Sequence, residues 1–515
     1  MSTSKTLRAG AAILAAAGTM SFTALPATAA EVPDGPALAR NLVKKVTGEG
    51  VNRHLIALQR LADRNGGNRA AGTAGHAQSA QYVESKLIAA GYDVSRQPFS
   101  FTFSETLAEA LTTPSGPVPI SIMTLSTSTP VGGITAPLSV VPLAGDATPG
   151  CEAADYPAGT AGKIALVSRG GCTFADKQSA AADAGAVAAI VYNNADGPLN
   201  GTLGSDPALV KIPTGGITRA AGEALAASGG VVTVELRSLR EERQSFNVVA
   251  QTKTGKKNNV VMAGAHLDSV TEGPGINDNG SGSAGLLETA IQLGGSPKVN
   301  NAIRFAWWSA EEVGLVGSTK YVQSLTFEQQ LDIALYLNFD MIASPNAGYF
   351  VYDGDDSDAT GAGPGPYGSA QIEAAFHGFL NATGTPTRGS DFTGRSDYGE
   401  FIANGIPAGG LFTGAEGVKT QEQADLWGGQ AGVAYDRCYH QRCDNLGNVD
   451  RTALDRNSDA IAWVTASYAI STEDVNGVPP RAARAKAVKA AQTKSAQSKS
   501  ARTAAPTHDD HEVLS

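Results

Sequence analysis

Three long apolar runs, each leading into side chains of metal-binding type, constrain the fold of this chain most strongly. NVVMAGA leads into His266 and Asp268, NAIRFAWWSA leads into Glu311 and Glu312, and IALYLNFD ends at Asp340. Continuous apolar runs indicate strands that are buried on both faces, as in an α/β sheet covered by helices. Because open α/β sheets carry their sites at the carboxyl ends of the strands, these side chains predict a site at that edge.

Two further segments place potential ligands in loops. INDNGSGSAGLLETAIQLGG puts Asp278 in a tight Gly/Asn-rich loop ahead of a helix expected to begin near Ser283, and DRCYHQRCDN puts His440 between Cys438 and Cys443. Histidine nitrogens and carboxylate oxygens are zinc ligands. Adjacent glutamates are usually a solvated surface pair, but carboxylates at the ends of buried strands are costly unless a cation or water meets them. The combined pattern therefore favours a metal site.

The first residues have the pattern of a secretory signal peptide. Lys5 and Arg8 precede an apolar run, which ends at the small-residue sequence ATA at 27–29. The alternative interpretation is an apolar helix of a cytosolic protein. No later run is long and apolar enough to span a bilayer. We therefore expect a secreted, extracellular protein whose signal peptide covers 1–30.

The cysteines also suit an exported protein. Four cysteines can pair in three ways, and here they form two local groups, Cys151 with Cys172 and Cys438 with Cys443. Nearest-neighbour pairing would close two short loops and restrict the unfolded chain. Zinc ligation by cysteine is the competing interpretation, which an oxidising compartment disfavours.

Length and charge limit the partners. With 515 residues and 42% hydrophobic content, the chain is long enough for two globular domains. Its formal net charge is -10, and no basic stripe appears in its body. Nucleic acid and anionic membranes need clustered basic residues, so neither is an expected partner. A monomer is expected.

The middle of the chain has its own pattern. KIALVSRGGCTFADKQSAAADAGAVAAIVYNN predicts a strand, a turn, an Ala-rich helix and a second strand. Together with IPTGGITRAAGEAL, this segment resembles the protease-associated (PA) domain. The predicted division of the chain is 1–30 signal peptide, 31–110 first part of the main domain, 111–243 inserted PA domain, 244–474 main domain continued, and 475–515 disordered basic tail.

The motifs of the main domain resemble the secreted bacterial leucyl aminopeptidases of metallopeptidase family 28. They are AGAHLDSV, GINDNGSGSA, RFAWWSAEEVGLVGS, YLNFDMIASPNAGYFVYD, GRSDY, GGLFTGAE, CYHQRCDN and LDRNSDAIA, and the resemblance covers 50–105 and 245–471. It implies an α/β fold with a mixed central β-sheet flanked by helices, as in zinc aminopeptidases, with the small β-rich PA domain inserted.

The resemblance also implies a site with two Zn²⁺ ions per chain. Its metal ligands are His266 and Asp340 on one zinc, Glu312 and His440 on the other, and Asp278 bridging both. Some secreted relatives also bind calcium, and Asp455 and Asp459 match carboxylates of that site. Lys44 and Lys45 stand where an acidic partner is expected, which argues against Ca²⁺ here.

Roles in catalysis and substrate binding follow from the same resemblance. Glu311 is the general base, Asp268 orients His266, and Tyr439 stabilises the oxyanion. The side chains that line the substrate site are Arg395, Met341, Gly394 and Phe412. The chemistry is consistent, because a carboxylate cannot deprotonate bulk water, whereas metal-bound water has a pKa of about 7.

The resemblance thus implies a dizinc aminopeptidase that acts on peptides with a free N-terminus and prefers large apolar N-terminal residues. Two alternatives stay open. A related fold serves carboxypeptidases and glutaminyl cyclases, which the reaction product would distinguish. A peptide-binding relative without catalytic activity would lack ligands that are all present here.

Overall fold

The structure, a computed structural model, describes residues 35–143, 145–204, 206–473, 478 and 480–504. The predicted signal peptide at 1–30 lies outside the described residues, as do the last residues of the predicted tail at 505–515. Among the described helices, none is both long and apolar enough to cross a membrane.

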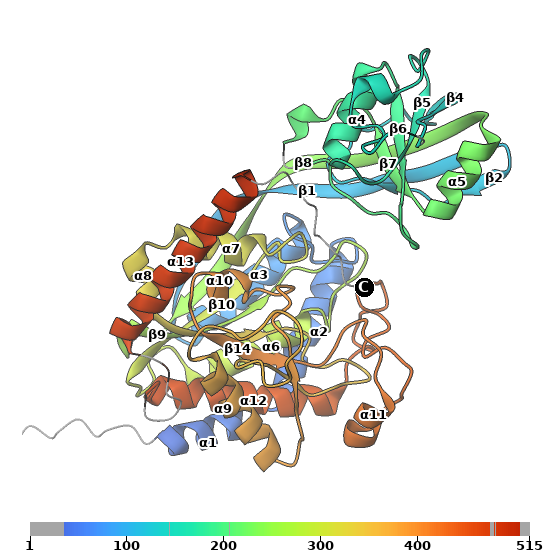
Figure 1. The fold of residues 1–515 in the computed structure, drawn as a ribbon. Coiled ribbons are helices and arrows are strands. Elements are labelled where there is room, and N and C mark those ends of the chain that lie inside the picture. The colour runs from blue at the N-terminus through green and yellow to red at the C-terminus, as the bar shows by residue number, and fades with distance from the viewer. Residues whose placement is uncertain (1–34, 144, 205, 474–477, 479, 505–515) are drawn as a thin grey trace, which may run out of the picture.

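A mixed β-sheet flanked by helices forms the main domain, which confirms the predicted fold class (Figure 1). Neighbouring strands of this part follow the order β13-β12-β14-β11-β9-β10-β8. Strands β14, β11, β9 and β10 run parallel, and β8 joins β10 antiparallel. The bounds are β8 Val231–Gln251, β9 Lys256–His266, β10 Asn301–Trp308, β11 Ile333–Phe339, β12 Phe350–Tyr352, β13 Arg388–Ser390 and β14 Ala408–Phe412.

Helices cover both faces of this sheet, which explains why its strands read as continuous apolar runs. Along β10, Phe305 and Trp307 enter the core on one face, whereas Ala306 and Trp308 enter the core on the other. The helices on the first face are α1 Gly35–Lys45, α2 Gly48–Arg64, α3 Ala74–Ala89, α6 Gly280–Leu293, α9 Ser369–Ala382 and α12 Arg451–Ile470. Two helices that pack on the second face are α7 Val316–Ser324 and α10 Gly399–Ala403.

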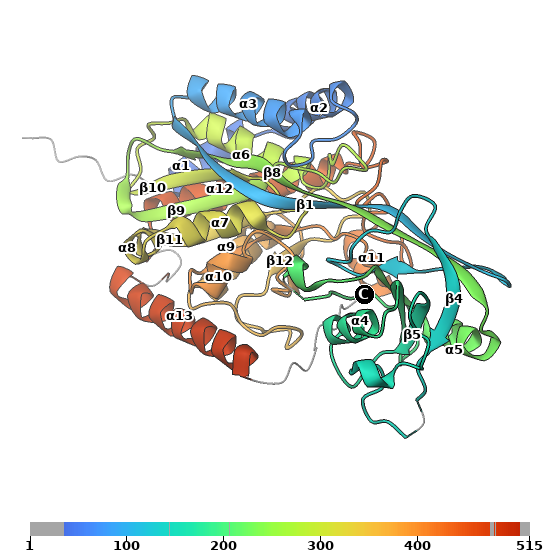
Figure 2. The same ribbon diagram turned by 90° about the horizontal axis from the view of Figure 1, so that it is seen from above.

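Two long strands carry the chain out to the inserted domain and back. Strand β1, Asp93–Thr113, pairs antiparallel with β8 over nearly its whole length, with one irregularity between Thr106 and Ala108. Figure 2 shows both strands running together from the main domain into the insertion. The predicted divisions at 110 and 243 therefore fall within continuous strands rather than in linkers.

The inserted domain has its own two cores, one on each side of a small sheet. Strands β4, β5, β6 and β7 are its consecutive neighbours, and β5, β6 and β7 pair in parallel. Its elements are β2 Gly116–Val118, β3 Ser121–Ile122, β4 Ile134–Val140, β5 Ile164–Ser168, α4 Phe174–Asp183, β6 Ala188–Tyr192, β7 Thr214–Ile217 and α5 Arg219–Ser228.

The C-terminal segment differs from the predicted disordered tail. Helix α13, Arg481–Ala504, packs against α8, Phe327–Asp332, and against α10. Val488 is 1% exposed, and the Arg481 guanidinium lies 2.7 Å from the Glu328 carboxylate. Its Ala- and Lys-rich composition has high helix propensity, and the buried Val488 together with the ion pairs of Arg481 with Glu328 and Asp332 docks the helix.

Candidate active site

The predicted ligands converge because their strands are parallel neighbours. His266 is the last residue of β9 and pairs in register with Trp308, the last residue of β10. Asp340 directly follows β11, on the other side of β9. Three carboxyl ends therefore meet at one edge, the place where open α/β sheets form their sites.

Asp278 is the centre of the cluster. Its Oδ1 lies 3.2 Å from His266 Nε2, and its Oδ2 lies 3.3 Å from His440 Nε2. Around these two contacts, Asp340 Oδ1 lies 3.3 Å from His266 Nε2, and Glu312 Oε2 lies 3.0 Å from His440 Nε2. The two oxygens of one carboxylate thus face two different sets of potential ligands.

These residues fit divalent metal ions. The ligand atoms of His266, Glu311 and Asp340 lie within 4.8 Å of one another, as do those of His266, Asp278 and Glu312. Glu312 Oε1 and Asp340 Oδ1 are buried without a hydrogen-bond partner, which is costly for a carboxylate oxygen unless a cation meets it. Adjacent tetrahedral zinc ligands lie about 3.3 Å apart, which agrees with the spacing between these donors.

The charges at the site also call for a cation. Burial raises the pKa of Glu311 well above its usual value and that of Glu312 to about 8, with neighbouring carboxylates adding to both effects. Burial alone would lower the pKa of His440, but Asp278 and Glu312 raise it to about 10. Such mutual perturbation shows an excess of negative charge, which divalent metal ions would balance.

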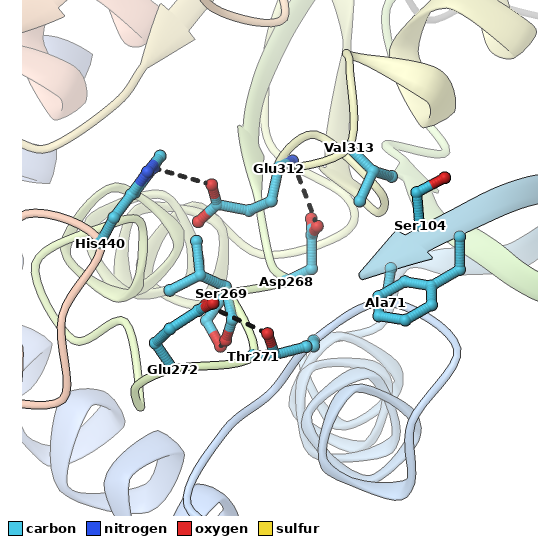
Figure 3. A pocket seen from close by; sticks show the side chains of 12 residues that line it. Ala71, Ser104, Asp268, Ser269, Thr271, Glu272, Glu312, Val313 and His440 are labelled. Carbon is cyan, nitrogen blue, oxygen red and sulfur yellow. Dashed lines mark hydrogen bonds and ion pairs between the residues drawn. The ribbon is translucent and has the colours of Figure 1, made fainter. Parts of the chain in front are cut away.

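Asp268 contacts more than the histidine it was expected to orient. His266 Nδ1 lies 3.1 Å from the backbone oxygen of Asp268 and 3.7 Å from its carboxylate Oδ1. The carboxylate instead accepts hydrogen bonds from the amides of Glu311, at 3.3 Å, and Glu312, at 3.4 Å. Figure 3 shows the second of these contacts. Asp268 therefore links the end of β9 to the turn that carries both glutamates.

The loop of Asp278 is held by residues that the sequence interpretation missed. The Asp444 carboxylate accepts from the amides of Asn277, at 2.8 Å, and Asp278, at 2.9 Å. Arg69 is fully buried and donates to the backbone oxygens of Leu267, Pro274 and Gly275. Asp444 lies in the motif CYHQRCDN, so its nearness to His440 was the available signal.

A second group that the sequence interpretation missed supports Asp340. Ser396 donates from Oγ to Asp340 Oδ2 at 2.5 Å, and Asn338 donates to Ser396 Oγ at 2.8 Å. Ser396 directly follows the predicted substrate residue Arg395 in GRSDY. That motif therefore supplies a partner of a metal-type carboxylate as well as an arginine.

The remaining predicted residues surround the same edge. Tyr439 stacks on His440 with ring centroids 3.8 Å apart, and its Oη accepts from Arg395 Nη2 at 3.2 Å. Met341 follows Asp340 and is 3% exposed. Phe412 ends β14 beside it, because Leu411 pairs with Phe339 in parallel register.

Gly394 directly precedes Arg395, whereas the two carboxylates considered for calcium, Asp455 and Asp459, lie on α12. Gly394 adopts a φ of 79° just before Arg395, with open space where a Cβ would stand. The Asp455 carboxylate accepts a hydrogen bond from the amide of Gly48. Asp455 lies on α12, one turn before Asp459. Among the described residues, no group of three potential metal ligands includes Asp455 or Asp459.

Both disulfides form between nearest neighbours, Cys151 with Cys172 and Cys438 with Cys443. The second closes a loop with a sequence separation of 5 around His440, whose φ is 55° and whose side chain is 42% exposed. Because a positive φ is strained for a non-glycine residue, the cross-link helps to hold His440 in position.

Replacing both Cys438 and Cys443 with alanine should therefore lower zinc affinity by about 10-fold or more, as for other residues that orient a metal ligand. Zinc titration against a competing chelator would measure the change. Replacing Cys151 and Cys172, which lie in the inserted domain, is the matched control and should leave zinc affinity unchanged. Equal losses in the two variants would contradict a specific role for the His440 loop.

The fold and site define an α/β protein whose buried histidines and carboxylates could hold metal ions. Comparisons with known proteins identify its family. The profile of Peptidase family M28 matches residues 247–465, and that of the PA domain matches 134–225. The probable lipoprotein aminopeptidase LpqL of Mycobacterium tuberculosis is 47% identical over 463 residues, covering 88% of this chain and 92% of its own. Leucine aminopeptidase 2 of Arthroderma otae is 48% identical over 424 residues, which cover 81% of this chain and 83% of the relative.

Solved structures agree with these relatives. The aminopeptidase from Aneurinibacillus sp. strain AM-1 has a TM-score of 0.63 and 29% identity, covering 86% of this chain and 98% of its own. The zinc aminopeptidase BSAP of Bacillus subtilis has a TM-score of 0.54 and 25% identity, covering 87% and 99%. The chain belongs to peptidase family M28 and contains a PA domain, which confirms the resemblance read from its motifs.

Proposed function

We propose that this protein is a secreted aminopeptidase that uses two zinc ions to remove leucine-like residues from the N-termini of peptides. The observation that carries the proposal is the division of the Asp278 carboxylate between two ligand sets, one with His266 and Asp340 and one with His440 and Glu312. The names of the relatives, which include leucine aminopeptidase and zinc aminopeptidase, support the same activity.

In this proposal, His266 and Asp340 would hold one zinc ion, Glu312 and His440 would hold the other, and Asp278 would be a ligand shared by the two sets. Zinc supplies a Lewis acid for the scissile carbonyl and lowers the pKa of bound water to about 7. The protein's part is to fix the ligands, exclude bulk water and move protons. His266 and Asp340 are nearly fully buried, which suits that task.

Glu311 is proposed as the general base. It lies beside the cluster without being needed as a ligand in this assignment, and its Oε2 is 3.9 Å from His266 Nε2. Burial raises its pKa, which is the direction that lets a carboxylate accept a proton from the attacking water and return it to the leaving amine.

Tyr439 is proposed to donate a hydrogen bond to the developing oxyanion. Burial raises the pKa of its phenol, so the proton stays on the oxygen at neutral pH. Arg395 donates to the same oxygen and is itself held by Glu416 at 2.7 Å. The hydrogen bond from Arg395 and the stacking of the ring on His440 therefore both hold the phenol in position.

The preference for a free N-terminus has an electrostatic basis in the proposal. Glu311 and Asp340 place negative charge at one side of the site, where the α-ammonium group of a peptide can be neutralised. Met341 and Phe412, which lie on the same side as Asp340, would shape the pocket for the first side chain, and Gly394 is proposed to contribute to it as well. A protein or peptide with a blocked N-terminus would lose this contact.

Three observations support secretion. The sequence begins with a signal-peptide pattern, both cysteine pairs form disulfides, and one relative is named as a lipoprotein aminopeptidase. Disulfides persist mainly in oxidising compartments. N-terminal sequencing of protein recovered from culture medium would test both export and the cleavage near 30.

The test of the activity is hydrolysis of leucine p-nitroanilide beside its N-acetylated form, with and without chelator and added zinc. Turnover of the free-amine substrate alone, lost on chelation and restored by zinc, is expected. No turnover by zinc-loaded protein would reject the leucine aminopeptidase proposal. Release of a C-terminal amino acid or of pyroglutamate would instead identify a carboxypeptidase or a cyclase.

A further inference from the structure

A pocket of about 320 Å³ opens beside the metal-type cluster. Figure 3 shows it from close by, with His440 and Ser104 at opposite ends, Glu312 and Val313 along one side, and Glu272 and Thr271 along the other. The described residues that line it are Ala70, Ala71, Phe103, Ser104, Asp268, Ser269, Val270, Thr271, Glu272, Glu312, Val313 and His440.

The position of the pocket says which part of a substrate it can hold. It borders Glu312 and His440, whereas Asp340, Met341 and Phe412 are not among its lining residues. In the proposed function, the N-terminal residue occupies the Asp340 side of the cluster. The peptide beyond the scissile bond must then leave across the Glu312 and His440 side, which is where this pocket begins.

Strand β1 forms the outer wall of the pocket and is firmly anchored there. The Phe103 ring packs with Ala71 and lies 3.4 Å below the Arg243 guanidinium, which is paired with Glu241 at 2.5 Å. Ser104, the residue after Phe103 on β1, is exposed. The strands that carry the inserted domain thus reach the edge of the active site.

The same stretch of β1 can bind an extended peptide. In the described chain, β1 pairs with β8 along one edge, while on its other edge β2 pairs only with residues 111–113. In an antiparallel strand, consecutive residues direct their backbone groups to opposite edges. One of Phe103 and Ser104 therefore offers its amide and carbonyl to an incoming strand, as in peptide recognition by β-augmentation.

The charge of the pocket favours one class of peptide. Glu272 is exposed at the end near His440, and its carboxylate accepts a hydrogen bond from Thr271 at 3.1 Å. None of the described residues that line the pocket is a lysine or an arginine. A cationic side chain entering there would meet Glu272 without a competing basic group in the lining.

We infer that the pocket binds the residues that follow the scissile bond, with β1 as a template for the peptide backbone and Glu272 selecting a basic side chain at the second position of the substrate. This inference rests on the proposed aminopeptidase function and deepens it. It assigns specificity to Ser104, from the strand that carries the insertion, and to Glu272, from the loop after β9.

The first experiment compares kcat/KM for the peptide Leu-Lys-Ala-Ala with that for leucine p-nitroanilide, which has no residues beyond the leaving group. Ser104→Trp should fill the pocket and lower the ratio of peptide to anilide activity by about 10-fold or more. Ser100→Trp is the matched control, because Ser100 is also exposed on β1 but lies outside the pocket. It should leave the ratio unchanged.

The second experiment does not depend on a bulky substitution. Wild-type protein should cleave Leu-Lys-Ala-Ala faster than Leu-Glu-Ala-Ala by about fivefold, the order expected for one solvent-exposed ion pair. Glu272→Gln should remove this preference, and high salt should weaken it. Glu223→Gln, which removes an exposed carboxylate from α5 of the inserted domain, is the control and should retain it.

The outcomes separate the two proposals. If wild-type protein releases leucine from neither leucine p-nitroanilide nor the two peptides, the proposed function fails. If it cleaves the anilide and the peptides, the function stands, and two results would overturn the assignment of this pocket. One is an equal ratio of peptide to anilide activity in Ser104→Trp and Ser100→Trp. The other is a Glu272→Gln protein that keeps the wild-type preference for lysine.

Discussion

Replacing Glu311 with glutamine should lower kcat by about 10³-fold or more while the protein keeps its zinc. The side chain keeps its size but loses the ability to accept a proton, and general base catalysis contributes about 10² to 10⁴ in rate. Glu311 is not among the proposed zinc ligands, so metal content should not fall. Steady-state kinetics with leucine p-nitroanilide and elemental analysis of the same sample would measure both quantities.

Glu373→Gln is a matched control for this substitution. Glu373 is also a buried glutamate, but it contacts the amide of Gly354 and the ring of His377, away from the proposed zinc ligands. It should retain kcat near the wild-type value. A Glu311→Gln protein that keeps both zinc and more than about a tenth of wild-type kcat would rule out the general base role.

The strand-end residues could be predicted because burial leaves a clear mark on sequence. The runs before His266, Glu311 and Asp340 are apolar on both faces, since both faces of β9, β10 and β11 enter cores. A polar residue at the end of such a run is conspicuous, and parallel pairing brings these ends together. His440 follows no such run and was singled out as a histidine between two cysteines, whereas its role as a ligand of one particular zinc came from the family resemblance.

The supporting residues could not be found in this way. The role of Asp268 beside His266 was expected, but the additional hydrogen bonds from the amides of Glu311 and Glu312 to its carboxylate were not. Arg69 binds three backbone oxygens about 200 residues further along the chain, as its contact with Leu267 shows. Side-chain contacts to backbone groups depend on loop geometry, and they leave no periodic pattern in a single sequence.

Composition misled the interpretation of the tail and of the domain divisions. The Ala/Lys/Ser-rich segment around Val488 reads as disordered, because its hydrophobicity is low, but helix propensity and one buried anchor are enough to dock α13. The division predicted at 110 falls within β1, which continues to Thr113 because β8 pairs with it over nearly its whole length. In β1 and β8, long-range pairing overrides the preference of the local composition.

Replacing Asp278 with alanine should have the largest effect of any single substitution, because one carboxylate serves both ligand sets. Zinc content should fall from the proposed two ions per chain to less than one, and kcat/KM should fall by about 10⁴-fold or more as water loses its activation. Asp340→Ala and His440→Ala each remove a ligand from one set only, so each should leave about one ion bound.

Asp353→Ala is the matched control for the loss of Asp278. Asp353 belongs to another acidic group, with Asp355 and Glu373, but its two oxygens accept from the amides of Ser357, at 3.0 Å, and Asp358, at 2.9 Å. Its charge is thus met by backbone groups, whereas that of Asp278 faces two histidines. Zinc content should therefore stay at two ions in Asp353→Ala. Two zinc ions in Asp278→Ala would show that the ions do not share this carboxylate.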